Sequence, residues 1–214
     1  MIQENIEKIR KLVPKNITIV AATKTRSVDE IKQAIACGIT DIGENYVQEA
    51  EKKFNDIGKI VSWHFIGHLQ KNKVKKAVKI FDIIETIDSF EIAKEISKHS
   101  ETKFPVLIEI NSAREQQKSG VYPENLEQVL INISTLSNIS VLGLMTMGPV
   151  VENPEEIRPY FRLTKQLFDF TKKLNLPNVE MKILSMGMSN SWQVAIEEGA
   201  TCIRIGTAIF GPRT

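Results

Sequence analysis

The sequence alternates eight times between a short run of apolar and β-branched residues and a longer segment with helical periodicity, and no other feature constrains the fold as strongly. Strict alternation predicts parallel strands joined by crossover helices. Eight such units favour a closed (β/α)8 TIM barrel, with an open doubly wound sheet as the alternative. The predicted strands cover residues 17–22, 41–43, 63–66, 83–87, 105–110, 141–145, 180–184 and 201–205.

Helical patterns fill the segments between these strands, and one extra helix precedes the first strand at residues 3–12. Ser27 and Glu30 form a capping box that starts the helix ending near Cys37, and Gly38 is a favoured residue just beyond a helix end. No linker rich in Pro, Gly or Ser interrupts the chain, so we expect residues 1–214 to form one domain. The remaining helices are predicted over residues 46–54, 70–78, 89–98, 124–136, 155–174 and 189–198.

The composition is that of an ordinary globular protein with a full core, at 42% hydrophobic and 25% charged residues. A formal net charge of +2 argues against a protein that mainly coats nucleic acid or an anionic membrane. The apolar runs are too short to span a membrane, and the charged residues 1–15 do not resemble a signal peptide. Cys37 and Cys202 fall in predicted core elements and fit a reducing cytosol, so we expect a cytoplasmic protein.

In a barrel of this type the active site lies at the carboxyl ends of the strands, where Lys24 is the most informative residue. Desolvation and a nearby Arg204 would lower the pKa of its amine and favour the neutral nucleophile that Schiff-base formation requires. A lysine that simply reaches solvent is the alternative. The other residues at strand ends are Glu44, Asn45, Tyr46, Gly67, His68, Gln70, Asn111, Thr146, Met147, Ser185, Gly187, Ser189, Gly206 and Thr207.

Small and hydroxylated residues follow the seventh and eighth strands, where barrels commonly bind phosphate. Ser189, Gly206 and Thr207 could donate amides and hydroxyls to such a group. Ordinary capping is the alternative, since Ser189 is also a natural N-cap of the predicted helix. A Schiff-base lysine opposite a phosphate cradle indicates a phosphorylated aldehyde. Pyridoxal 5′-phosphate is the common cofactor of this kind, and a phosphosugar aldolase is the competing interpretation.

Six segments, taken in order, resemble the pyridoxal phosphate homeostasis protein family, relatives of the barrel domain of alanine racemase. They are residues 20–25, 43–49, 64–73, 143–147, 184–189 and 204–211. The resemblance implies that Lys24 holds the cofactor as an internal aldimine and that Arg204 faces the pyridine nitrogen. It also implies that Asn45 lies near the ring and that the phosphate is held by Ser189, Gly206 and Thr207.

The resemblance further implies a carrier that buffers or delivers the cofactor to apo enzymes, without strong catalytic activity. One departure is Ser191, where the family often has Asp, and its loss would weaken helix capping slightly. The alternative is a fold-type III enzyme such as an amino-acid racemase. We expect the C-terminal β-domain of alanine racemase to be absent because the sequence ends at Thr214. Tyr46 and His68 are then the nearby candidates for a second base.

Two further patterns are weaker. His64 and His68 have metal-ligand spacing only on a helix, which Gly67 interrupts, so we expect no metal site. A lysine-rich helix could contact nucleic acid, but no aromatic residue is interleaved, and a solvated surface is favoured. We expect a monomer without nucleic-acid or membrane partners. The lysines are Lys71, Lys73, Lys75, Lys76 and Lys79.

Overall fold

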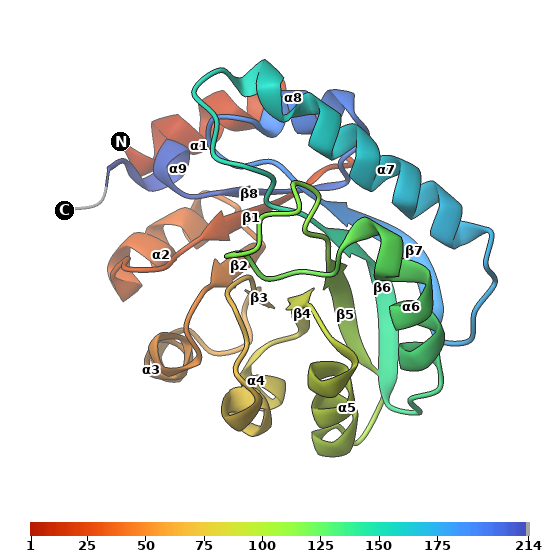
Figure 1. Ribbon diagram of the computed structural model, residues 1–214. Coiled ribbons are helices and arrows are strands. Elements are labelled where there is room, and N and C mark those ends of the chain that lie inside the picture. Colours follow the sequence, from red (N-terminus) through yellow and green to blue (C-terminus); the bar gives the residue numbers. More distant parts are fainter. Residues whose placement is uncertain (213–214) are drawn as a thin grey trace.

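A computed structural model describes residues 1–212 and shows a closed barrel of parallel strands that pair in chain order (Figure 1). Strand β8 pairs with β1 over four residues and closes the ring. The predicted barrel is therefore confirmed, and the open sheet is excluded. The strands are β1 (Thr18–Ala22), β2 (Asp41–Glu44), β3 (Ser62–Phe65), β4 (Ile83–Ile87), β5 (Phe104–Glu109), β6 (Ile139–Met145), β7 (Val179–Ser185) and β8 (Cys202–Ile205).

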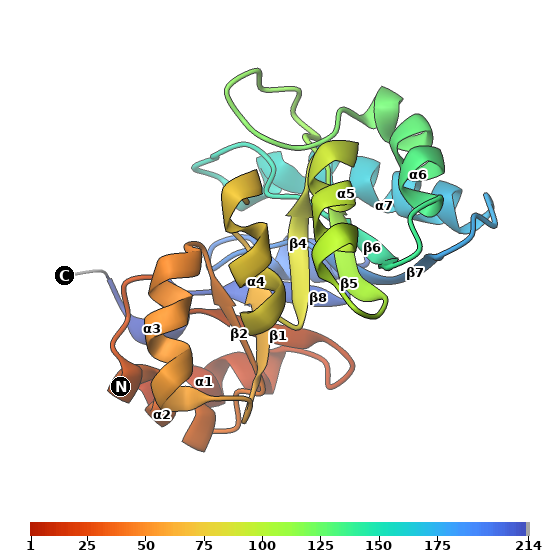
Figure 2. The same cartoon turned by 90° about the horizontal axis from the view of Figure 1, so that it is seen from below.

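The helices form an outer layer around the barrel (Figures 1 and 2), and the extra helix α1 lies beside α2 and α9. Three of the predicted helices begin with a 3-10 turn: η1 (Lys71–Lys73), η2 (Pro123–Asn125) and η3 (Pro154–Ile157). The α-helices are α1 (Ile2–Leu12), α2 (Val28–Ala36), α3 (Val47–Ile57), α4 (Val74–Ile80), α5 (Phe90–His99), α6 (Leu126–Ser134), α7 (Arg158–Lys172), α8 (Trp192–Glu197) and α9 (Thr207–Phe210).

The helix predicted to start at Ser189 begins only at Trp192, so its predicted start is wrong. Residues 188–191 form a turn in which the Ser191 amide donates to the Met188 carbonyl at 2.9 Å. Ser191 is the N-cap, and its Oγ accepts the Met188 amide at 3.1 Å. The sequence analysis also missed α9, a single turn after β8. The segment after β7 therefore lies outside regular helix up to Ser191, whereas Thr207 begins α9 directly after β8.

The main hydrophobic core fills the space between the strands and the surrounding helices. A smaller apolar cluster, formed by Ile83, Leu107 and Met145, lies inside the barrel. Alternation along β5 explains the division, because Leu107 belongs to the small cluster while its neighbours Val106 and Ile108 belong to the main core. Polar and charged side chains occupy the rest of the barrel interior.

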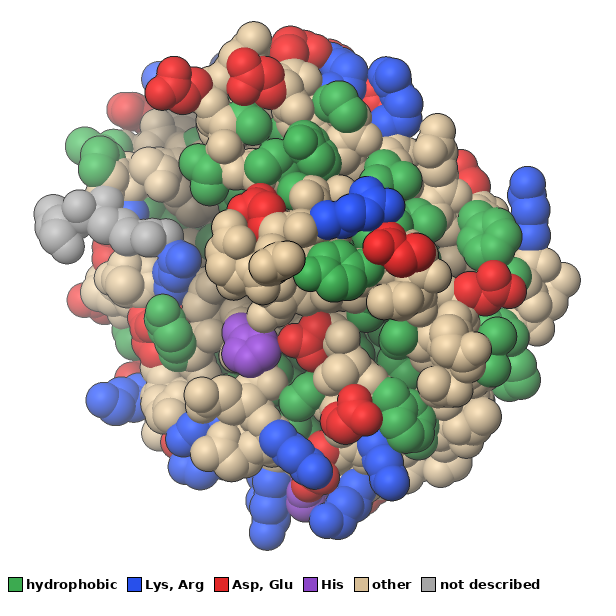
Figure 3. Space-filling view, in the orientation of Figure 1, with side chains coloured by type: hydrophobic (Ala, Val, Ile, Leu, Met, Phe, Trp, Pro, Cys, Tyr) green, Lys and Arg blue, Asp and Glu red, His purple; other side chains and the backbone are tan. Residues whose placement is uncertain are grey.

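Lysine and arginine side chains gather over α4 and α5, along the lower edge of the molecule in Figure 3. Acidic residues lie among them, and Lys76 pairs with Glu51 at 2.9 Å. Both side chains of this pair are about half exposed, so the contact adds little to stability. Among the helices of residues 1–212, we find none that is both long and apolar enough to cross a bilayer.

Candidate functional site

A cavity of about 620 Å³ opens at the carboxyl ends of the strands, and all six residues expected at a cofactor site line it. Lys24 and Asn45 come from the loops after β1 and β2, and Arg204 comes from β8. The volume lies within the range of roughly 300–1,000 Å³ that small-molecule sites occupy. The full lining is Ala22, Lys24, Asn45, Ile66, Met147, Met188, Ser189, Asn190, Arg204, Gly206, Thr207 and Ala208.

Lys24 follows the last residue of β1 by two positions and is half-buried at the cavity wall. The peptide before it continues the sheet, because the Thr23 amide donates to the Gly43 carbonyl at 2.9 Å. The next residue, Thr25, has a left-handed backbone with φ of 65°. The chain therefore turns sharply at Lys24, which lets a lysine from the barrel wall enter the cavity.

The loop after β7 is joined to α9 by a hydrogen bond, in which the Ala208 amide donates to Ser189 Oγ at 3.2 Å. Gly187 requires glycine, because its φ is 94° and an added Cβ would lie 2.6 Å from the Ala195 Cβ. Gly206 differs, because a Cβ there would meet its nearest atom, the Ala22 carbonyl oxygen, at 3.4 Å. The fold itself would tolerate alanine at position 206. The small residue leaves the backbone open toward the cavity.

Arg204 is 3% exposed, and its guanidinium is held from inside the barrel. Nη1 donates to Ser185 Oγ at 2.6 Å, and Nη2 donates to the Thr146 carbonyl at 2.8 Å. The Glu85 carboxylate lies 3.8 Å from Nη1. Since this carboxylate balances the charge of Arg204, the repulsion that the sequence analysis expected between Arg204 and Lys24 is reduced.

The balancing carboxylate belongs to a buried network along the barrel interior. Glu85 Oε2 accepts from Ser185 Oγ at 2.5 Å, and Glu85 Oε1 lies 2.6 Å from His64 Nδ1. His64 Nε2 lies 3.1 Å from Asp41 Oδ1 at the other end of the barrel. Burial alone lowers the pKa of His64, but hydrogen bonds and negative charge from Asp41 and Glu85 outweigh it and raise the pKa to about 9. His64 is therefore a cation at neutral pH.

The sequence analysis missed the roles of Glu85 and His64. A usable signal existed, because Glu85 stands in a strand whose other residues are all buried, and a buried carboxylate requires a partner. The sequence pattern had suggested for His64 only the role of a metal ligand, which Gly67 made unfavourable. His64 lies on β3 and binds carboxylates instead. In the described part of the chain, no three His, Cys, Asp or Glu side chains converge on a point that could hold a metal ion.

Glu109 lies at the end of β5, the strand four positions away from β1 and therefore across the barrel from Lys24. Burial and the neighbouring Asp88 carboxylate raise the pKa of Glu109 to about 7, while Arg204 opposes the shift. This carboxyl group titrates near neutral pH at the barrel mouth, although it does not line the main cavity.

The two residues considered as second bases do not line the main cavity. Tyr46 is 60% exposed, and His68 bonds Ser119 Oγ at 2.9 Å. Both line an adjacent cavity of about 420 Å³, which shares Asn45 with the main one. Ser119 belongs to the long loop between β5 and η2, which extends beyond the strands in Figure 2. His68 therefore ties that loop to the rim and does not face Lys24.

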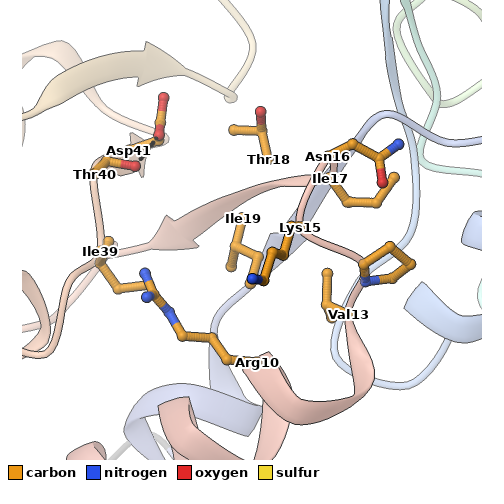
Figure 4. A pocket seen from close by; sticks show the side chains of 11 residues that line it. Arg10, Val13, Lys15, Asn16, Ile17, Thr18, Ile19, Ile39, Thr40 and Asp41 are labelled. Carbon is orange, nitrogen blue, oxygen red and sulfur yellow. Dashed lines mark hydrogen bonds between the residues drawn. The ribbon is translucent and has the colours of Figure 1, made fainter.

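Another groove, of about 430 Å³, lies at the opposite end of β1 and β2 (Figure 4). Arg10 reaches into it from α1, and its guanidinium donates to the Gly38 carbonyl. Thr40 donates to Asp41 at 2.6 Å on the far wall. Active sites of these barrels lie at the carboxyl ends of the strands, so this groove is not the candidate site.

The main cavity combines a primary amine, a hydroxyl- and amide-rich pair of loops, and an arginine that can only donate hydrogen bonds. An amine can attack an aldehyde carbon, and the two loops can hold an anionic group. These donors fit a phosphorylated aldehyde with a ring nitrogen that accepts a hydrogen bond. They lie around one cavity, as the sequence analysis expected.

Comparisons with known proteins identify relatives of this chain. Residues 1–214 match the family described as "Alanine racemase, N-terminal domain". The chain is 44% identical to the pyridoxal phosphate homeostasis protein of Aquifex aeolicus, over 91% of this chain and 86% of the relative. Its identity to the Haemophilus influenzae protein of the same name is 38%, over 100% of this chain and 93% of that one. The structure of PipY from Synechococcus elongatus with PLP bound superposes with a TM-score of 0.90 at 30% identity, covering 99% of this chain and all of PipY.

Proposed function

This chain belongs to the pyridoxal phosphate homeostasis proteins of the alanine racemase N-terminal domain family, and we propose that it binds pyridoxal 5′-phosphate covalently on Lys24. Its role is to hold the cofactor, buffer its free concentration and deliver it to apo enzymes. The observation that carries the proposal is that Lys24, Arg204 and the loops after β7 and β8 surround one cavity.

The cofactor's phosphate is expected to lie against Ser189, Gly206 and Thr207. The loop amides and hydroxyls can donate hydrogen bonds to it, and an anion strengthens such bonds. Asn45 would contact the ring, and Arg204 would donate to the pyridine nitrogen. Because a guanidinium keeps its protons, that nitrogen would stay unprotonated. An unprotonated ring is a weaker electron sink, which supports a carrier over an efficient catalyst.

When bound, the cofactor supplies an aldehyde carbon that a primary amine can attack. Lys24 would provide that amine from the cavity wall. Such a link between an amine and an aldehyde would be reversible in water. Reversibility is what a buffer requires, because the protein can load when the cofactor is abundant and release it when an apo enzyme competes.

We also propose that the protein acts as a cytoplasmic monomer with residues 1–214 as one domain. The rival function is that of a fold-type III enzyme such as an amino-acid racemase, which the alanine racemase fold of the family also fits. The observation that favours such an enzyme is the titratable carboxyl of Glu109, which lies across the barrel from Lys24. Turnover measurements on the loaded protein separate the two functions.

The direct test is to load the protein with cofactor, reduce it with borohydride and locate the adduct by peptide mass spectrometry. We expect the loaded protein to be yellow before reduction, and we expect the reduced adduct to map to Lys24. Lys24→Ala should remain colourless after loading. Lys15→Ala is the matched control, since Lys15 lies at the groove on the opposite end of the barrel and should not affect the colour. An adduct on another lysine, with Lys24→Ala still yellow, would overturn the assignment.

A further inference from the structure

A buried ion cluster lies behind the loop that carries Lys24. Lys53, on α3, lies at the centre of this cluster, and its side chain is only 8% exposed. Its Nζ donates to Glu44 Oε1 at 2.6 Å, to Glu49 Oε1 at 2.7 Å and to the Thr23 carbonyl at 2.7 Å. An ammonium has three N–H donors, so all of them are engaged.

The contacts of this cluster converge on the residues immediately before and after Lys24. Thr23 Oγ1 donates to Glu44 Oε1 at 2.7 Å, and the Thr23 carbonyl accepts from Lys53. On the other side, the Thr25 amide donates to Glu49 Oε1 at 2.6 Å. Both peptides flanking the lysine are therefore fixed by one set of charges, while the Lys24 side chain itself lines the cavity.

Thr25 adds an independent observation. Its φ of 65° is left-handed, a conformation that is unfavourable for a β-branched residue. Such a conformation persists only where the surroundings hold it, and the bond from its amide to Glu49 is such a restraint. The strain falls on the residue next to Lys24, where the chain must turn to present the amine.

Stability alone does not explain the cluster. Buried ion pairs lose about as much in desolvation as they gain in attraction, and apolar replacements are often neutral or stabilising. Glu44 Oε2 is buried without a hydrogen-bond partner, which adds to the cost of the cluster. Burial raises the pKa of the Glu44 carboxyl, and the charge of Lys53 opposes the shift. A core built only for stability would not keep these groups.

We propose that Lys53, together with Glu44 and Glu49, is the positioning cluster that holds Lys24 in attacking geometry toward the cofactor aldehyde. The inference rests on the proposed function, because it assigns a role toward the same covalent bond. Lys53 acts through the backbone on either side of Lys24 and does not touch the cofactor. It therefore governs how fast the covalent bond forms, and the phosphate and ring contacts govern non-covalent affinity.

The test separates these two quantities in Lys53→Met, which keeps a long apolar side chain and removes the charge. The first measurement is the rate of covalent bond formation with pyridoxal 5′-phosphate, followed by stopped-flow absorbance. The second is the affinity for pyridoxine 5′-phosphate, which lacks the aldehyde and can bind only non-covalently. We expect the rate to fall by about 10- to 100-fold, since small misplacements of a reacting group cost that much, with affinity for the alcohol unchanged.

Two further variants keep the test decisive. Glu49→Gln removes one charge of the cluster and should also lower the rate of covalent bond formation. It serves as the test variant if Lys53→Met fails to fold. Lys76→Met is the matched control, because Lys76 pairs with Glu51 on the exposed surface, and it should behave as wild type.

Covalent bond formation at the wild-type rate in both cluster variants would overturn the positioning role alone. A parallel loss of thermal stability, alcohol affinity and covalent rate would mark the cluster as merely structural and also overturn it. If wild-type protein forms no bond at Lys24, the proposed function fails, and the inference fails with it.

Discussion

The guanidinium of Arg204 lies 3.8 Å from the carboxylate of Glu85, and both side chains are almost completely enclosed by the barrel. Ser185 bridges them, and Glu85 also binds His64, whose far nitrogen meets Asp41. Two cations and two carboxylates thus share the barrel interior at neutral pH. The residue that faces the cofactor cavity depends on charges that lie deeper in the barrel.

The first prediction concerns alkaline stability. The pKa of His64 is raised to about 9 in the folded protein from an ordinary value near 6.5. A raised pKa means that the stabilisation is fully present below about pH 6.5 and is lost as the pH rises through 9. The shift corresponds to on the order of 3 kcal/mol. Urea unfolding from pH 6 to pH 10 should show this loss.

His64→Gln should be less stable than wild type at pH 6 and should show a flatter profile up to pH 10. His99→Gln is the control, because His99 binds Glu95 on the surface helix α5 and should keep the wild-type profile. A wild-type slope in His64→Gln would contradict the assignment of the alkaline loss to this residue.

The second prediction compares Gly206, which lines the main cavity, with Gly187, which does not. Gly206→Ala should leave apo stability within about 1 kcal/mol of wild type, because the Cβ meets only ordinary contacts and φ is −112°. It should nevertheless weaken binding of pyridoxal 5′-phosphate by roughly tenfold or more, since the methyl group occupies space the phosphate approaches. Gly187→Ala should instead destabilise the apo protein by about 1–3 kcal/mol. Calorimetry with and without cofactor distinguishes the two, and equal cofactor affinity in Gly206→Ala would contradict the cradle.

The third prediction concerns the hydroxyls. Ser189→Ala and Thr207→Val should each weaken cofactor binding, because in the proposed site each would remove one of several charge-assisted hydrogen bonds worth about 1.5–3 kcal/mol. Equilibrium titration followed by absorbance measures the change. Thr18→Val, at the opposite end of the barrel, should leave affinity unchanged. Unchanged affinity in both cradle variants would count against this phosphate site.

The fourth prediction concerns Glu109. Its folded pKa of about 7 exceeds the ordinary carboxyl value, so the fold favours its neutral form. That stabilisation is present below about pH 4.5 and is lost as the pH rises through 7. Glu109→Gln should therefore have a larger free energy of unfolding than wild type at pH 8, by on the order of 1–3 kcal/mol, and the two should match near pH 4. Glu156→Gln, at an exposed site, should change neither value.

The fifth prediction is that loaded protein racemises amino acids feebly. Arg204 would leave the cofactor ring a weak electron sink, and Tyr46 and His68 do not line the main cavity. Missing general acid–base help costs roughly 10²–10⁴-fold in rate. A chiral assay over L- and D-amino acids tests this. Turnover near about 10 s⁻¹ that disappears in Lys24→Ala would favour the racemase over the carrier.

The sequence by itself determined the barrel, because alternation of strand and helix patterns is a local property that leaves few topologies open. Strand-end reasoning together with the family resemblance also selected Lys24, Ser189 and Arg204, all of which line one cavity. The start of α8 was predicted wrongly, because Ser189 and Ser191 are both plausible N-caps and only the turn at residues 188–191 decides between them.

Only the tertiary structure decided which charges share the interior. Glu85 meets Ser185 across 100 positions of the chain, and Lys53 meets the Thr23 carbonyl across 30. No periodicity encodes such pairs, because they form between strands and helices brought together by barrel closure. Electrostatic energy depends on separation in space and on burial, and neither quantity is fixed until the barrel closes.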